Sequence, residues 1–166
     1  MANDQNAILR ACGEYYVASY LAGLGAVVAL TPHGSPGTDL LATSKTGERQ
    51  ISVQVKTGGS SSRTVVKRNP ANNQWTWRAG AKAMEHSSES KWFAMVYVGH
   101  WPIEGEPPKI FFVPSAYVAK VLKENPAGQQ DWFWMSDETA ARYDSARGHQ
   151  SVLATLGIDT ADPKSE

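Results

Sequence analysis

The sequence has little cysteine and no surplus of charge of either sign. Its single cysteine, Cys12, excludes a disulfide framework and any zinc site built from several cysteines. The 16 lysines and arginines equal the 16 aspartates and glutamates in number, so the chain is not a generic polycation that coats nucleic acid. Hydrophobic residues make up 42% of the 166 residues and charged residues 19%, which is typical of a globular protein. This length predicts one domain over residues 1–158 and a flexible tail over 159–166.

Long hydrophobic runs and a basic leader are also missing. The longest apolar stretches, such as residues 26–30, are far too short to span a bilayer. The first five residues lack the basic segment with which a signal peptide begins. We therefore expect a soluble cytoplasmic protein with no membrane partner.

Several common catalytic patterns are absent from the sequence. No Ser-His-Asp order and no nucleophile elbow is present, which argues against a serine hydrolase. The glycines at 13, 23 and 25 lie on or near a predicted helix rather than after a strand, so no dinucleotide-binding fingerprint is supported. The four histidines do not have the spacing of metal ligands: His33, His86, His100 and His149.

The pattern of apolar residues predicts a mixed α and β fold. Apolar residues recur at three- and four-residue steps over residues 4–24, which indicates an amphipathic helix that ends near Gly25. Further helices are predicted over 79–87, over 115–124 with Ser115 as N-cap, and after Ser136 or Asp137 with a break near Gly148. Strands are predicted over 26–30, 38–43, 49–56, 64–66, 74–77, 91–98, 109–113 and 131–135. This order is typical of an α+β core in which a central mixed sheet is flanked by helices.

Three polar residues lie in predicted strands at positions that the apolar pattern does not require. Asp39 opens an apolar strand, and Gln54 and Lys56 are two residues apart on the next strand, so their side chains leave on the same face. A hairpin through residues 44–48 places Asp39 close to both of them. Carboxylate, amide and backbone carbonyl oxygens suit Mg²⁺, with Mn²⁺ as a substitute. An ammonium group beside such a site stabilises charge on a phosphate, so these residues predict metal-assisted phosphodiester hydrolysis.

These residues resemble the core of the PD-(D/E)XK nuclease superfamily, which includes restriction endonucleases and Holliday-junction resolvases. Gly37-Thr38-Asp39 is followed after about fifteen residues by Gln54-Val55-Lys56, and Glu14 matches the glutamate that many members carry on the first helix. The motifs cover residues 8–57, and residues 91–124 are similar only in the order of elements. The resemblance implies a restriction-endonuclease-like core, in which a helix precedes a three-stranded meander and a second helix packs on the sheet.

The resemblance also implies roles for individual residues. Asp39 would be the main metal ligand, with Glu14 acting through water, Gln54 through its amide oxygen and Val55 through its carbonyl. Lys56 would be the catalytic lysine. The sequence departs from the family motif at two positions, because Thr38 precedes the aspartate where the motif has proline, and Gln54 replaces an acidic residue. The second change removes one negative charge and is expected to weaken metal binding.

The balanced net charge conceals a basic segment. Residues 45–91 hold nine basic and three acidic groups, a net charge of +6, whereas residues 1–44 carry −2 and residues 92–166 carry −4. Cations with interleaved aromatic residues favour a nucleic-acid backbone with base stacking. The residues proposed for this role are Arg63, Lys67, Arg68, Trp75, Trp77, Arg78 and Lys82. The alternative is that the tryptophans pack in the interior while the charged residues are solvated.

Together these patterns predict a magnesium-dependent endonuclease that acts on DNA, with a homodimer as one possible assembly. One alternative is an inactive nucleic-acid-binding module on the same fold, because Gln54 lowers the charge of the site. Another is a protein-interaction module of the immunity or antitoxin type. Taken singly, each site residue also has an ordinary structural role, such as the solvated face of a strand for Gln54 and Lys56.

Overall fold

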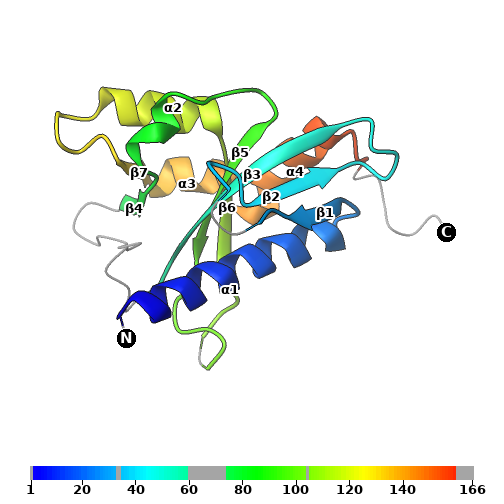
Figure 1. Cartoon of the computed structure of the whole chain (residues 1–166), viewed down its shortest axis with the longest axis horizontal. Helices are drawn as coiled ribbons and strands as arrows, with labels where there is room; N and C mark the ends of the chain where they lie inside the picture. The colour runs from blue at the N-terminus through cyan, green and yellow to red at the C-terminus, as the bar shows by residue number, and fades with distance from the viewer. Residues whose placement is uncertain (1, 33–34, 60–73, 104, 160–166) are drawn as a thin grey trace.

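The computed structural model describes the chain outside residues 1, 33–34, 60–73, 104 and 160–166, and of residues 2–5 and 145–147 it describes the backbone only (Figure 1). The predicted tail from 160 onward and the predicted strand over 64–66 lie outside the described residues. In chain order the elements are α1 (Ala2–Gly23), β1 (Val27–Leu30), β2 (Leu40–Thr43), β3 (Gln50–Gly58), β4 (Gln74–Arg78), the 3₁₀ helix η1 (Ala81–Met84), β5 (Lys91–Tyr97), β6 (Lys109–Pro114), α2 (Ser115–Glu124), β7 (Trp132–Ser136), α3 (Asp137–Tyr143) and α4 (Ser145–Leu156).

The main sheet has five strands in the order β1-β2-β3-β5-β6. Strands β1, β2 and β3 form an antiparallel meander, β3 pairs parallel with β5, and β5 pairs antiparallel with β6. A second, two-stranded sheet joins β4 and β7, which are far apart in the sequence. The predicted α+β class with a mixed sheet flanked by helices is therefore confirmed.

The two faces of the main sheet bury separate clusters of apolar side chains. One cluster joins α1 and α4 to the sheet, through residues such as Val17 and Leu156. The other joins the sheet to α2, η1 and the β4–β7 pair, through residues such as Leu122 and Phe133. Figure 1 shows α1 and α2 on opposite sides of the sheet. The molecule thus has three layers with β3 and β5 near the middle.

Side chains of β3 alternate between these two layers, as the sequence predicts. Ile51, Val53 and Val55 belong to the cluster on the α1 side. Gln54 and Lys56 are partly exposed and pair in register with Phe93 and Met95 of β5, which belong to the opposite cluster. Because paired residues of neighbouring strands project to the same face, Gln54 and Lys56 leave the sheet on the side of β4 and η1.

Helix α1 approaches β3 closely at Gly13. A Cβ atom at this position would overlap Oγ1 of Thr57, so only glycine allows the observed distance between the helix and the strand. After the helix ends at Gly23, Gly25 takes a φ of 95°, the left-handed conformation expected where the chain turns into β1.

Three local predictions are wrong in detail. Residues 79–87 form only the short η1, and the break between the last two helices lies at Asp144, while Gly148 is inside α4. Ser115 is not the N-cap of α2, because Pro114 occupies that position. The buried Ser115 hydroxyl instead accepts a hydrogen bond from the Ser88 N–H (3.1 Å) and donates one to the Ser88 carbonyl (3.0 Å). The Ser115 hydroxyl thus links the start of α2 to the segment before β5 through two hydrogen bonds.

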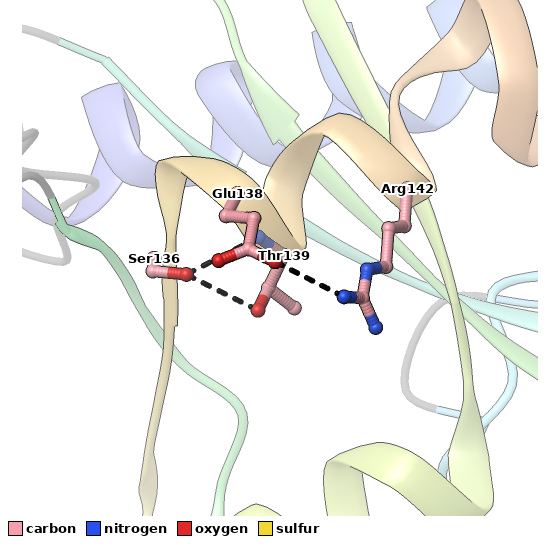
Figure 2. Close-up of polar contacts among 4 residues, drawn as sticks. All are labelled: Ser136, Glu138, Thr139 and Arg142. Carbon is pink, nitrogen blue, oxygen red and sulfur yellow. Dashed lines mark hydrogen bonds and ion pairs between the residues drawn. The ribbon is translucent and has the colours of Figure 1, made fainter.

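The predicted cap at Ser136 is confirmed. Its hydroxyl oxygen accepts a hydrogen bond from the Thr139 N–H at 3.2 Å, and Glu138 pairs with Arg142 at 3.2 Å one turn later (Figure 2). None of the helices in the described part of the chain combines the length and apolar character that a membrane crossing needs.

Candidate functional site

Asp39 is held in place by two hydrogen bonds to the backbone of β3, one through its own N–H and one through its carboxylate. The predicted hairpin is present, with Leu40 opposite Val53 and Thr43 opposite Gln50. Just before β2, the Asp39 N–H donates to the Val53 carbonyl at 2.9 Å. The Val55 N–H in turn donates to Oδ2 of Asp39 at 2.7 Å. The carboxylate is therefore fixed beside the strand that carries Gln54 and Lys56.

This hydrogen bond lies where one edge of β3 becomes open. The pairing of β2 with β3 ends at Leu40 and Val53, whereas β3 continues to Gly58 alongside β5. In a strand the N–H and C=O of one residue point to the same side. The Val55 carbonyl consequently points to the same edge as the N–H that meets Asp39, and both face the gap beyond the end of β2.

A cavity of about 430 Å³ occupies this edge, between α1, β3 and the end of β4. Its lining brings together all four predicted catalytic residues and the predicted carbonyl ligand: Glu14, Asp39, Gln54, Val55 and Lys56. The remaining lining residues are Asn6, Leu9, Arg10, Ser35, Thr57, Trp77 and Arg78. We refer to this space as the site cavity.

Helix α1 supplies the wall of the site cavity opposite the hairpin. Arg10 and Glu14 are four residues apart and so lie on the same side of the helix. The helix is positioned by the contact between Gly13 and Thr57, immediately beside Glu14. The carboxylate of Glu14 therefore reaches the same space as Asp39 although the two residues are 25 positions apart in the sequence.

The charge on Lys56 is destabilised by its surroundings. Burial lowers the pKa of its ammonium group from the ordinary value of 10.5. The carboxylate of Asp39 opposes this effect, while the positive charges of Arg10 and Lys91 lower the pKa further. Lys56 therefore gives up its proton more readily than a lysine in water does.

The donor atoms of the site cavity fit a hard divalent cation. Asp39 provides a carboxylate whose hydrogen bond within the described residues is on Oδ2, which leaves Oδ1 for a ligand. Gln54 and Val55 provide neutral oxygens, and Glu14 provides a second carboxylate. In the described ranges no three residues of the types His, Cys, Asp and Glu gather as a metal-binding group. A cation here would depend on two carboxylates and neutral oxygens and would retain water, as Mg²⁺ commonly does.

The predicted stacking role of Trp75 and Trp77 needs correction. The two side chains are only 8% and 1% exposed, and their rings stack on each other with centroids 6.0 Å apart. The indole N–H of Trp75 donates to Oδ1 of Asp137, and that of Trp77 donates to the Val96 carbonyl. Both tryptophans therefore pack in the interior, which was the alternative to base stacking, and neither indole face is open to a nucleic-acid base.

The basic residues predicted to bind nucleic acid are placed only in part. Arg63, Lys67 and Arg68 lie outside the described residues. Arg78 lines the site cavity and pairs with Asp131 at 2.8 Å. Lys82 lies on η1 and lines a neighbouring cavity.

Two further cations at the site, Arg10 and Lys91, are not among the predicted site residues. The position of Arg10 one helical turn before Glu14 was a usable signal, because residues at this spacing share a helix face. Lys91 had no comparable local signal, since only the parallel pairing of β3 with β5 brings it close to Gln54.

The sequence matches no protein-family model, and no curated protein matches it significantly. The function is therefore inferred from the residues and geometry of the site cavity.

Proposed function

We propose that this protein is a magnesium-dependent endonuclease that hydrolyses phosphodiester bonds in DNA. The observation that carries the proposal is the 2.7 Å hydrogen bond from the Val55 N–H to the Asp39 carboxylate. It holds this carboxylate at the open edge of β3, in one cavity with Glu14, Gln54 and Lys56.

The order of elements supports the resemblance to PD-(D/E)XK nucleases. Helix α1 precedes the antiparallel meander of β1, β2 and β3, and α2 packs on the opposite face of the sheet. The aspartate precedes the second strand of the meander and the lysine lies in the third, as in the motif of that superfamily.

The residues that would hold Mg²⁺ are Asp39, Gln54 and Val55, with Glu14 acting through water. When bound, the cation supplies positive charge to the scissile phosphate and acidifies a water molecule. The protein fixes the direction of the Asp39 carboxylate through the Val55 N–H, so little reorganisation is needed when a ligand binds.

Lys56 accepts the proton of the attacking water and stabilises the negative charge that develops on the phosphate. Because burial lowers its pKa, a larger share of Lys56 is neutral at a given pH than of an exposed lysine, and the neutral amine accepts a proton from the attacking water. The resulting ammonium group then stabilises the negative charge that builds up on the phosphate oxygens.

Cleavage of DNA by variants that each lack one charge of the site tests this proposal. Plasmid and branched DNA are incubated with Mg²⁺ or Mn²⁺, and cleavage by the wild type is compared with that by Asp39→Asn and Lys56→Ala. We expect each substitution to lower the rate at least roughly a hundredfold, the loss typical when a charge-stabilising group is removed. The matched controls are Glu48→Gln and Lys45→Ala, whose exposed side chains lie at the opposite end of the hairpin and should leave the rate unchanged.

Three outcomes distinguish the alternatives. Cleavage that survives both Asp39→Asn and Lys56→Ala contradicts the proposed site. DNA binding without cleavage under both metals favours the inactive nucleic-acid-binding module. An absence of DNA affinity even at low salt favours the protein-interaction module.

A further inference from the structure

A second cavity borders the site cavity at Gln54, on the face of the sheet that carries η1. This flanking cavity has a volume of about 680 Å³ and shares Gln54 with the site cavity. Its wall includes Gly37 of the loop before Asp39, Lys82 of η1, and Lys91. Gln54 thus lies at the junction of two open spaces, with Lys56 on one side and Lys91 on the other.

Lys91 lies against the loop that leads to Asp39. It is the first residue of β5 and pairs with Ser52, so its side chain leaves on the same face as Gln54. Its Nζ is 3.2 Å from the place where a Cβ atom on Gly37 would lie. Gly37 has a φ of 68°, which favours glycine, and the missing side chain leaves room for the ammonium group.

Arg10 provides a positive charge on the other side of Lys56. Its exposed side chain lines the site cavity from α1. Within the described part of the chain neither Arg10 nor Lys91 forms an ion pair. Both lie close enough to Lys56 for their charges to lower its pKa.

The protein therefore holds three cations near one another on three separate elements. The carboxylate of Asp39 offsets part of their mutual repulsion. Arg10 and Lys91 form no ion pair within the described residues, so their charges are available to an anionic ligand. Arg10 and Lys56 line the site cavity, whereas Lys91 lines the flanking cavity. Cations that are spread over two neighbouring cavities suit an extended polyanion better than a single phosphate.

We propose that Arg10 and Lys91 bind the backbone phosphates on either side of the phosphate that faces Lys56, so that a nucleic-acid strand crosses the open edge of β3 from α1 to the start of β5. The identity of this ligand as nucleic acid rests on the proposed function. In this arrangement Arg10 and Lys91 are positioning residues, since they hold the strand while Asp39, Gln54 and Lys56 face the scissile bond.

The salt dependence of binding tests these contacts separately from catalysis. The affinity of a fluorescently labelled DNA duplex is measured by anisotropy in EDTA over a series of salt concentrations. Each phosphate contact contributes about 0.9 to the slope of log K against log salt. We expect Arg10→Gln and Lys91→Gln each to reduce the slope by about 0.9, and the double variant by about 1.8. Lys45→Gln, at the far end of the hairpin, should keep the wild-type slope.

Charge-retaining variants show whether the effect comes from the charge. Arg10→Lys and Lys91→Arg should keep the wild-type slope, whereas the same loss in these variants as in the glutamine variants would overturn the proposal. Unchanged slopes in Arg10→Gln and Lys91→Gln would also overturn it, as would a wild-type protein that fails to bind at low salt.

Different results would contradict the proposed nuclease activity and the proposed path of the strand. Reduced slopes in a protein that cleaves nothing with Mg²⁺ or Mn²⁺ would support the path of the strand and refute the nuclease. Cleavage that depends on Asp39 and Lys56 but is accompanied by unchanged slopes would do the reverse.

Discussion

At the scale of single residues, the site is built around one lysine that folding makes less basic. Burial and the positive charges of Arg10 and Lys91 lower the pKa of Lys56, while the carboxylate of Asp39 raises it. The net effect is a lower pKa. A buried charge of this kind reduces the stability of the folded protein, which is a common cost of a functional site.

Replacement of Lys56 by methionine is expected to stabilise the protein and to abolish the proposed cleavage of DNA. Methionine keeps most of the apolar stem without the charge, so the free energy of unfolding at neutral pH should increase by about 1 kcal/mol. Urea denaturation measures this change. Lys45→Met provides the control, because Lys45 is exposed and its charge is not buried on folding. A loss of stability in Lys56→Met would mean that attraction to Asp39 outweighs burial.

The stabilisation should depend on pH with a definite sign. The folded-state pKa of Lys56 lies below the ordinary 10.5, so between these two values the unfolded chain binds more protons than the folded chain. The wild type therefore loses stability as the pH falls through this window, and Lys56→Met does not. The difference between the two proteins should be largest at neutral pH and should shrink as the pH rises toward 10.5.

At the scale of elements, the contact of α1 with β3 sets where Glu14 and Arg10 lie. Glycine in the interior of a helix costs roughly 1 kcal/mol relative to alanine, so its presence at position 13 needs a structural reason. The side chain of Thr57 occupies the space that a Cβ on Gly13 would need. Thr57 Oγ1 is buried and has no hydrogen-bond partner within the described residues, so the close fit rather than a polar contact explains the glycine.

Gly13→Ala should therefore destabilise the protein in spite of the better helix propensity of alanine. The new Cβ forces α1 away from β3, and such overpacking typically costs 1–3 kcal/mol. The matched control is Gly23→Ala near the end of the same helix, where a Cβ meets nothing within 4 Å and a change of less than roughly 1 kcal/mol is expected.

A second substitution separates this contact from other effects of alanine. Thr57→Ala removes Oγ1 and Cγ2, the first of which gives the shortest contact with the new Cβ. The double variant Gly13→Ala/Thr57→Ala should therefore be more stable than the sum of the single changes predicts. Strict additivity of the two changes, measured by urea denaturation, would contradict the proposed contact.

At the scale of the whole molecule, the sheet separates two buried clusters, and the second cluster carries one wall of the site. The β4–β7 pair rests on the sheet through Trp75, Trp77 and Phe133. Arg78 follows directly from Trp77 and lines the site cavity. The buried tryptophans thus hold β4, and with it Arg78, at the wall of the site cavity.

Trp77→Ala distinguishes this supporting role from base stacking. Removal of a fully buried tryptophan typically costs 3–5 kcal/mol, and we expect a loss of this size in the free energy of unfolding. A stacking residue would instead lose about 1–3 kcal/mol of DNA affinity with little change in stability. Arg78→Ala is the control for the neighbouring position, since an exposed ion pair such as that with Asp131 contributes less than roughly 1 kcal/mol.

The sequence by itself determined the elements whose patterns are local. The alternation of Ile51, Val53 and Val55 identified β3, and the short connection to β2 fixed their antiparallel pairing. Once those two strands pair, Asp39 must lie near Gln54 and Lys56, so this part of the site followed from residues that are near in the chain. Hydrophobic periodicity and turn length suffice there because they involve neighbours a few residues apart.

Only the tertiary structure decided the features that depend on distant pairings. The parallel pairing of β3 with β5 brings Lys91 to Gln54. The packing of the β4–β7 pair on the main sheet buries two tryptophans for which the sequence allowed either base stacking or interior packing. The close contact of Gly13 with Thr57 places Arg10 at the same site. These contacts depend on which surfaces of the folded elements are complementary, and no pattern among neighbouring residues carries that information.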